Sequence, residues 1–149
     1  MTLLANKKAH FEYEVLRTLM AGVVLTGAEV KSLRHKSGSL TGSFVKIIGE
    51  EAFLLNAQIS PYKFANNQDY DPKRTRKLLL RHKEIASLLE ASQQKGQSLI
   101  PLTFELLGNH IKVKVGVARG RKQFEKRAKL KERDIARDMA REMRDKISV

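Results

Sequence analysis

Residues 111–117 constrain the fold more than any other stretch, because their side chains alternate strictly in character. Apolar side chains occupy every second position, and the residues between them are basic or glycine: Ile111, Val113, Val115 and Val117 against Lys112, Lys114 and Gly116. A period of two predicts a β-strand with one face in a core and a basic opposite face. The apolar residues 99–107 come just before, and the intervening Gly108-Asn109 predicts a hairpin.

Five further segments predict three more strands and two helices. Residues 44–48 and 52–59 flank a short glycine-containing turn and predict a second hairpin, and residues 11–19 fit an early strand. Thr26 followed by Glu29 forms a capping box, which predicts a short helix to about residue 34. Apolar residues at helical spacing predict another helix over 82–94, ending before Gly96. With about six strands and two or three helices, we expect a mainly β protein, a small antiparallel barrel with outer helices.

The segment 71–80 predicts a cationic platform. Four cations, Lys73, Arg74, Arg76 and Lys77, fall within five residues and run into three leucines. The leucines favour a core, so we expect the cations to stand in solvent at its rim. Pro72 stiffens the start of the segment. Arginine forks onto phosphates, which favours a phosphate backbone as partner over a merely solvated loop.

The charge balance also indicates a polyanionic partner. The formal net charge is +13 over 149 residues, and residues 119–149 hold 12 Lys/Arg against 6 Asp/Glu. We therefore divide the chain into a folded domain, 1–118, and a basic arm, 119–149.

No apolar run approaches the roughly 20 residues of a membrane span, and the N-terminus has too short an apolar stretch for a signal peptide. We expect a cytoplasmic protein that does not bind membranes.

The basic arm allows two interpretations. Ile135, Met139, Met143 and Ile147 recur every four residues and form a narrow apolar stripe, and Phe124 stands alone in a basic run. An ordinary surface helix would pack this stripe on the barrel. The thinness of the stripe favours the alternative, an arm that is disordered alone and becomes helical on nucleic acid.

The chain offers few residues for catalysis. Its four histidines lack metal-ligand spacing, there is no cysteine, and no nucleophile elbow or phosphate-binding loop is present. Glu50 and Glu51 look like a solvated pair in a turn. We expect no catalytic residue, no metal and no cofactor.

Several motifs together resemble one family. The segment 71–80 closely resembles the DP-x-RTRKLLL motif of small protein B, the SsrA-RNA (tmRNA)-binding protein of bacterial trans-translation. Residues 21–34, 51–57, 59–62 and 115–122 match in order and spacing, so the similarity covers about residues 6–146.

The resemblance implies an OB-like six-stranded barrel that binds the tRNA-like domain of tmRNA and delivers it to stalled ribosomes. It implies a tail that is unstructured when free and helical in the empty mRNA channel near the decoding centre. Partners would be tmRNA, the stalled ribosome with its ribosomal RNA, and, indirectly through tmRNA, elongation factor Tu and alanyl-tRNA synthetase. The RNA-contact candidates that carry over are Glu29, Lys31, Arg34, Arg74, Arg76, Lys77, Leu79, Lys112 and Lys114. The ribosome-contact candidates in the tail are Arg119, Arg121, Lys122, Glu125, Lys126 and Arg127.

Three positions depart from the family pattern. Glu125 stands where the family usually has Asp, which keeps the charge. His10-Phe11 replaces an Arg-His pair, so Phe11 could stack but could not donate a hydrogen bond from its side chain. Met20 replaces a common Glu.

Two rival functions remain open. A general ribosome-associated or assembly RNA-binding protein would bind many RNAs with little preference. An RNA-processing enzyme would need an acid–base pair that the sequence does not reveal.

Overall fold

The computed structural model describes residues 1–147, and the side chains of these except residues 123, 124 and 145–147. Over this range the chain forms nine strands and four helices. In order they are β1 (Thr2–Ala5), α1 (Ala9–Glu12), β2 (Tyr13–Val23), α2 (Gly27–Arg34), β3 (Gly38–Ser39), β4 (Phe44–Ile48), β5 (Glu51–Leu55), β6 (Gln58–Ile59), β7 (Arg76–Leu79), α3 (His82–Ser92), β8 (Gln97–Leu107), β9 (His110–Gly120) and α4 (Gln123–Ile147). The mainly β prediction is confirmed.

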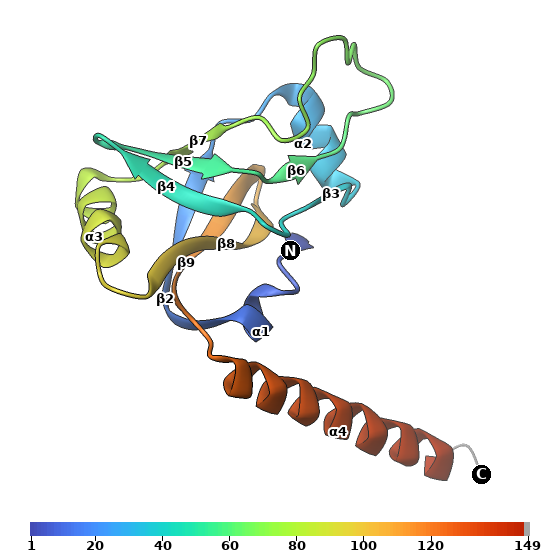
Figure 1. The fold of residues 1–149 in the computed structure, drawn as a ribbon. Coiled ribbons are helices and arrows are strands. Elements are labelled where there is room, and N and C mark those ends of the chain that lie inside the picture. Colours follow the sequence, from blue (N-terminus) through green and yellow to red (C-terminus); the bar gives the residue numbers. More distant parts are fainter. Residues whose placement is uncertain (148–149) are drawn as a thin grey trace.

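One curved antiparallel sheet dominates the molecule. Seven strands follow the order β1-β8-β9-β2-β7-β5-β4, and β3 pairs with β6 in a separate ribbon. The sheet wraps around a core, but its edge strands β1 and β4 do not pair with each other, so the barrel stays open (Figure 1). The sheet has seven strands where about six were expected, and β1 and β7 lie in segments without a period-two pattern in the sequence.

The alternating strand lies inside this sheet, between β8 and β2. In β9 the apolar residues Val113 and Val115 are fully buried, whereas Lys112 and Lys114 are only half-buried. β9 pairs along its length with β8 through a hairpin at Gly108, whose φ of +62° suits glycine. This confirms the predicted hairpin and the predicted core face.

Local signals set most element boundaries. The Glu29 amide donates to Thr26 Oγ1 at 3.2 Å, and the Thr26 amide donates to Glu29 Oε1 at 2.9 Å, so the capping box forms as predicted. The predicted strand 52–59 is instead divided at Asn56, whose φ of +61° turns the chain from β5 into β6. The predicted strand 11–19 begins only at Tyr13, because residues 9–12 form the short helix α1.

Helix α4 projects away from the sheet as a single long rod (Figure 1). The side chains of Ile135, Met139 and Met143 are 51%, 62% and 60% exposed, so their stripe does not pack on the barrel. A cation–π contact joins the helix to α1, with Arg133 Cζ 4.4 Å from the centre of the Phe11 ring. The predictions for the side chains of Phe124 and Ile147 fall outside the described residues.

The joint between sheet and helix is built from basic residues. Arg119 pairs with Glu14 at 2.5 Å, and this hydrogen-bonded pairing lowers the pKa of Glu14. Arg119 also approaches Glu125 at 3.7 Å. Arg121 Nε donates to the carbonyl oxygens of His10 (3.2 Å) and Tyr13 (3.1 Å). Sheet pairing continues to residue 120, so the first residues of the predicted arm belong structurally to the barrel.

Candidate nucleic-acid interface

The cationic platform folds as a turn that leads directly into β7. Asp71 closes the turn, because its carboxylate accepts from the Lys73 amide at 2.9 Å and its carbonyl accepts from the Arg74 amide at 3.1 Å. From Arg76 the strand alternates, so Arg76 and Leu78 are buried while Lys77 and Leu79 are exposed. The two-residue alternation of β7 therefore buries Arg76 and leaves Lys77 in solvent.

Arg76 corrects the expectation that all four cations stand at the rim. Its side chain is 0% exposed, and its Nη2 lies 2.5 Å from the Glu29 carboxylate, which is 1% exposed. A buried guanidinium is tolerable only when its charge is paired and its donors are satisfied. Arg76 meets this condition by also donating to the carbonyl oxygens of Ala57 at 2.6 Å and Pro72 at 3.0 Å.

Glu29 is the centre of this polar cluster. Its carboxylate also accepts from Arg74 Nε at 3.1 Å and from the Tyr70 hydroxyl at 3.1 Å. Burial alone would raise the pKa of Glu29, but hydrogen bonds from Arg74, the Thr26 amide and Arg76 outweigh it and lower the pKa to about 2. The pKa of Tyr70 rises because the hydroxyl is buried and faces the Glu29 charge. Glu29 is therefore an anion that anchors α2 to the platform.

The cluster divides the RNA-contact candidates into two groups. Glu29 and Arg76 are buried in it, and Arg74 is 32% exposed with one side held by Glu29. The others have exposed or half-buried side chains: Lys31 and Arg34 on α2, Lys77 and Leu79 on β7, and Lys112 and Lys114 on β9. Lys77 pairs with Glu51 at 3.3 Å, an exposed contact of little energy.

The ribosome-contact candidates of the tail lie in two places, the joint between sheet and helix, and the start of helix α4. Arg119 and Arg121 are held at the joint. Lys122 lies just before α4, and Glu125, Lys126 and Arg127 lie in its first two turns. Lys122 and Arg127 are exposed, whereas Glu125 and Lys126 are half-buried.

Sequence reasoning missed two features around the platform. Tyr70 is part of the buried cluster, and only its place just before Asp71-Pro72 could have drawn attention to it. Tyr62 and Phe64 form aromatic contacts beside α2, a feature signalled only by their spacing around Lys63.

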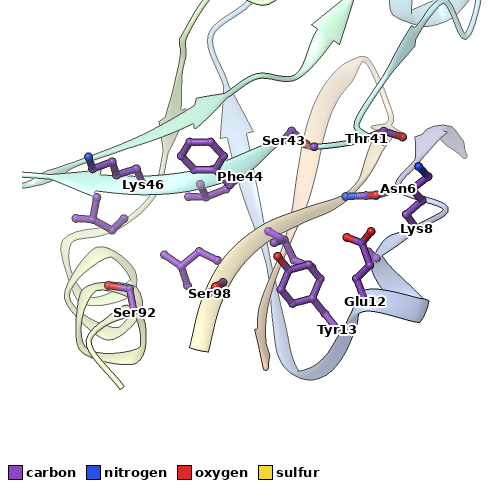
Figure 2. A pocket seen from close by; sticks show the side chains of 16 residues that line it. Asn6, Lys8, Glu12, Tyr13, Thr41, Ser43, Phe44, Lys46, Ser92 and Ser98 are labelled. Carbon is purple, nitrogen blue, oxygen red and sulfur yellow. The ribbon is translucent and has the colours of Figure 1, made fainter. Parts of the chain in front are cut away.

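A cavity of about 590 Å³ opens between β4 and β8, next to α1 (Figure 2). Hydroxyl-bearing residues line it, including Ser43, Ser92 and Ser98, together with Lys8, Lys46 and the carboxylate of Glu12. Of the described residues that line this cavity, Glu12 is the one carboxylate, and the other ionisable side chains are Lys8, Tyr13 and Lys46.

Two further features of the described part of the chain concern metal sites and membrane spans. Within residues 1–147, no three His, Asp or Glu side chains gather as metal ligands would. No helix in the same range combines the length and the apolar character that a membrane span needs.

The fold and the platform define a class of protein. A small antiparallel β domain holds a rim of exposed lysines and arginines around a rigid buried ion pair, and carries a long basic helix. Fixed cations on a rigid scaffold are the usual means of binding a nucleic-acid backbone. The molecule thus has the form of a basic nucleic-acid-binding β protein.

Comparison with known proteins identifies the family. A family model described as SmpB protein matches residues 3–145. The chain belongs to the SmpB family, which confirms the resemblance seen in the sequence motifs.

The relatives and a solved structure agree with this assignment. An SsrA-binding protein of Staphylococcus saprophyticus is 46% identical over 143 residues, covering 96% of this chain and 93% of the relative. An SsrA-binding protein of Staphylococcus aureus strain JH1 is 43% identical over the same shares. A chain from a solved structure described as "tmRNA-SmpB: a journey to the center of the bacterial ribosome" is 42% identical, with a TM-score of 0.69, and the match covers 80% of this chain and 85% of that one.

Proposed function

We infer that this chain is a tmRNA-binding adaptor of trans-translation, which binds the tRNA-like domain of tmRNA and delivers it to stalled ribosomes. The single observation that carries this inference is membership of the SmpB family over residues 3–145. Relatives at 43–46% identity are named SsrA-binding proteins. The platform beside α2 supplies the cations that such binding requires.

We propose that the RNA is held by exposed and half-buried side chains of the platform and of the neighbouring α2 and β9. Lys31, Arg34, Arg74 and Lys77 would contact phosphates, with Lys112 and Lys114 on the outer face of β9 and Leu79 beside them. Glu29 and Arg76 would act indirectly, because their side chains are buried and hold α2 and β7 in register. Shape and phosphate contacts of this kind are how folded RNA is usually recognised.

We propose a separate role for the tail. Arg119 and Arg121 would fix the direction in which α4 leaves the barrel, as their contacts with Glu14 and α1 suggest. Lys122, Glu125, Lys126 and Arg127 would then meet ribosomal RNA in the empty mRNA channel. Helix α4 carries abundant exposed charge for this purpose.

The remaining steps would belong to partners. Elongation factor Tu and alanyl-tRNA synthetase would act on tmRNA, not on this chain, and the chain itself would perform no chemistry. The cytoplasm, where ribosomes translate, is the compartment that follows from this role.

A competition binding assay at physiological salt tests the proposal. The labelled RNA is a tRNA-like domain of tmRNA, and the competitor is an ordinary elongator tRNA. We expect the tRNA to compete at least tenfold more weakly, about 1.4 kcal/mol. Equal competition would favour a general RNA-binding protein instead.

A further inference from the structure

Three aromatic rings gather where α2 ends and the loop after β6 begins. The His35 and Tyr62 rings are nearly parallel, with an interplanar angle of 11° and centres 6.1 Å apart. Phe64 meets Tyr62 edge-on at 5.5 Å. We call His35, Tyr62 and Phe64 the aromatic shelf. It borders a cavity of about 400 Å³ together with Ser32, Ser37, Pro61 and Lys63.

Phe64 makes this shelf unusual. Its side chain is 76% exposed, more than any other phenylalanine or leucine among the exposed apolar residues of the described chain. A ring left in water gives up most of the free energy that its burial would provide. The packing of this chain does not account for its position.

Two lysines flank the rings of Tyr62 and Phe64. Lys31 Nζ lies 5.6 Å from the centre of the Tyr62 ring, and Lys63 Nζ lies 4.9 Å from the centre of the Phe64 ring. Both distances fall within the range of cation–π attraction. The Tyr62 and Phe64 rings therefore each have a positive charge beside them.

The backbone beneath the shelf is held firmly. Ser32 Oγ donates to the Ser60 carbonyl at 2.6 Å, and the Ser60 amide donates to the Ser37 carbonyl at 3.2 Å. The Asn67 side-chain amide donates to the Tyr62 carbonyl at 2.8 Å. The exposed Phe64 ring and the half-buried Tyr62 ring thus stand on a prearranged loop, which lowers the entropy lost on binding.

The chemistry of the shelf favours RNA over protein. Lysine is depleted at protein–protein interfaces, whereas unpaired bases are commonly held by exposed aromatic rings beside cations. The shelf also adjoins the RNA-contact candidates, because Lys31 and Arg34 belong to α2. A bound RNA that lies along α2 would reach the shelf with its next nucleotides.

We propose that the aromatic shelf stacks an unpaired base of the bound tRNA-like domain, with Lys31 and Lys63 at the adjoining phosphates. This proposal rests on the proposed function and extends it to a second kind of contact. The platform supplies charge, and the shelf supplies a surface that distinguishes an unstacked base from a paired one.

The test substitutes Phe64 in the full chain and measures affinity for a transcript of the tRNA-like domain. Phe64→Leu keeps an exposed apolar side chain but removes the π-face, and we expect about tenfold weaker binding. Phe64→Trp keeps the π-face and should restore the affinity. Phe44→Leu on β4, where the ring is 38% exposed, is the matched control and should bind as the wild type does.

The salt dependence separates stacking from charge. Loss of a stacked base should leave the slope of log affinity against log salt unchanged. Lys31→Ala should instead make this negative slope shallower by about 0.7–0.9, because one phosphate contact is lost. A changed slope in Phe64→Leu would mean that the ring acts through its neighbouring cations, and would overturn the proposal.

Further outcomes separate the shelf from the proposed function. If Phe64→Leu binds with wild-type affinity while the wild type still prefers the tRNA-like domain over tRNA, the proposal for the shelf is overturned and the proposed function stands.

If the wild type shows no preference for the tRNA-like domain, a 12-nucleotide oligoadenylate serves as the probe. Weaker binding of Phe64→Leu to it would support base stacking, and equal binding would overturn it. A loss seen only with vacant ribosomes would assign the base to ribosomal RNA and overturn the proposal as stated.

Discussion

Arg76 and Glu29 form an ion pair that is closed to solvent, with Nη2 and Oε2 2.5 Å apart and exposures of 0% and 1%. The two residues are 47 positions apart in the chain, and the pair joins β7 to the first turn of α2. A motif that looks like a continuous cationic surface in the sequence thus contains a structural anchor.

Removal of this anchor should destabilise the fold. We expect Arg76→Met to lower the free energy of unfolding by about 3–5 kcal/mol, because Glu29 would remain as a buried, poorly compensated charge. Urea denaturation measures the change. Lys77→Ala is the neighbouring control, since its pair with Glu51 is exposed and should contribute about 1 kcal/mol or less. A double variant, Glu29→Met with Arg76→Met, should be less destabilised than the sum of the single variants, and additive losses would argue against direct coupling.

Stability should fall in acid through Glu29. Its folded pKa of about 2 lies below its ordinary value of 4.5, so the folded state favours the charged carboxylate. The resulting stabilisation, on the order of 3 kcal/mol, is complete above about pH 5 and is lost as the pH falls towards 2. Glu29→Gln should be less stable at neutral pH, and its free energy of unfolding should depend less on pH between 5 and 2. An unchanged pH dependence in that variant would show that other carboxylates control acid unfolding.

Charge removal at the rim should change the salt dependence of RNA binding. Arg74→Ala combined with Lys77→Ala should flatten the log–log slope by about 1.4–1.8, because each phosphate that is no longer neutralised removes about 0.7–0.9 from it. Lys129→Ala in α4 is the control and should leave the slope for the isolated tRNA-like domain unchanged. A variant with Arg74 and Lys77 removed but the wild-type slope would show that the RNA does not touch this platform.

The tail should be separable from RNA binding. A chain ending after Lys122 keeps the contacts of Arg119 and Arg121 with the barrel, and should bind the tRNA-like domain with nearly wild-type affinity. The same chain should fail to support tagging in a translation assay with stalled ribosomes. A chain with residues 123–149 replaced by a glycine–serine linker of equal length controls for simple length. Tagging by either variant would mean that α4 is dispensable.

Sequence patterns could predict elements whose stability is decided locally. The capping box of Thr26 and Glu29 needs only a turn of helix, and the alternation from Ile111 to Val117 needs only one buried sheet face. Both were found where predicted. The division at Asn56 was not predictable in the same way, because a left-handed residue among apolar neighbours has no periodic signature.

The candidate site was only partly predictable. The motif from Asp71 to Leu80 was recognised as a cationic platform, but the strand register sends Arg76 inward and Lys77 outward. A charged side chain is expected at the protein surface unless a buried group of opposite charge neutralises it. For Arg76 that group is the carboxylate of Glu29 in α2, 47 positions away in the chain. Likewise, the rings of His35 and Tyr62 meet only because α2 and the loop after β6 pack together.

The sequence by itself determined the β class, the basic character and the family of this protein, because periodicity, charge and motif order are local properties of the chain. Only the tertiary structure decided which cations are free for RNA and which belong to the core. That choice depends on long-range pairing: a guanidinium can be buried at position 76 because folding brings the Glu29 carboxylate to it and satisfies its remaining donors.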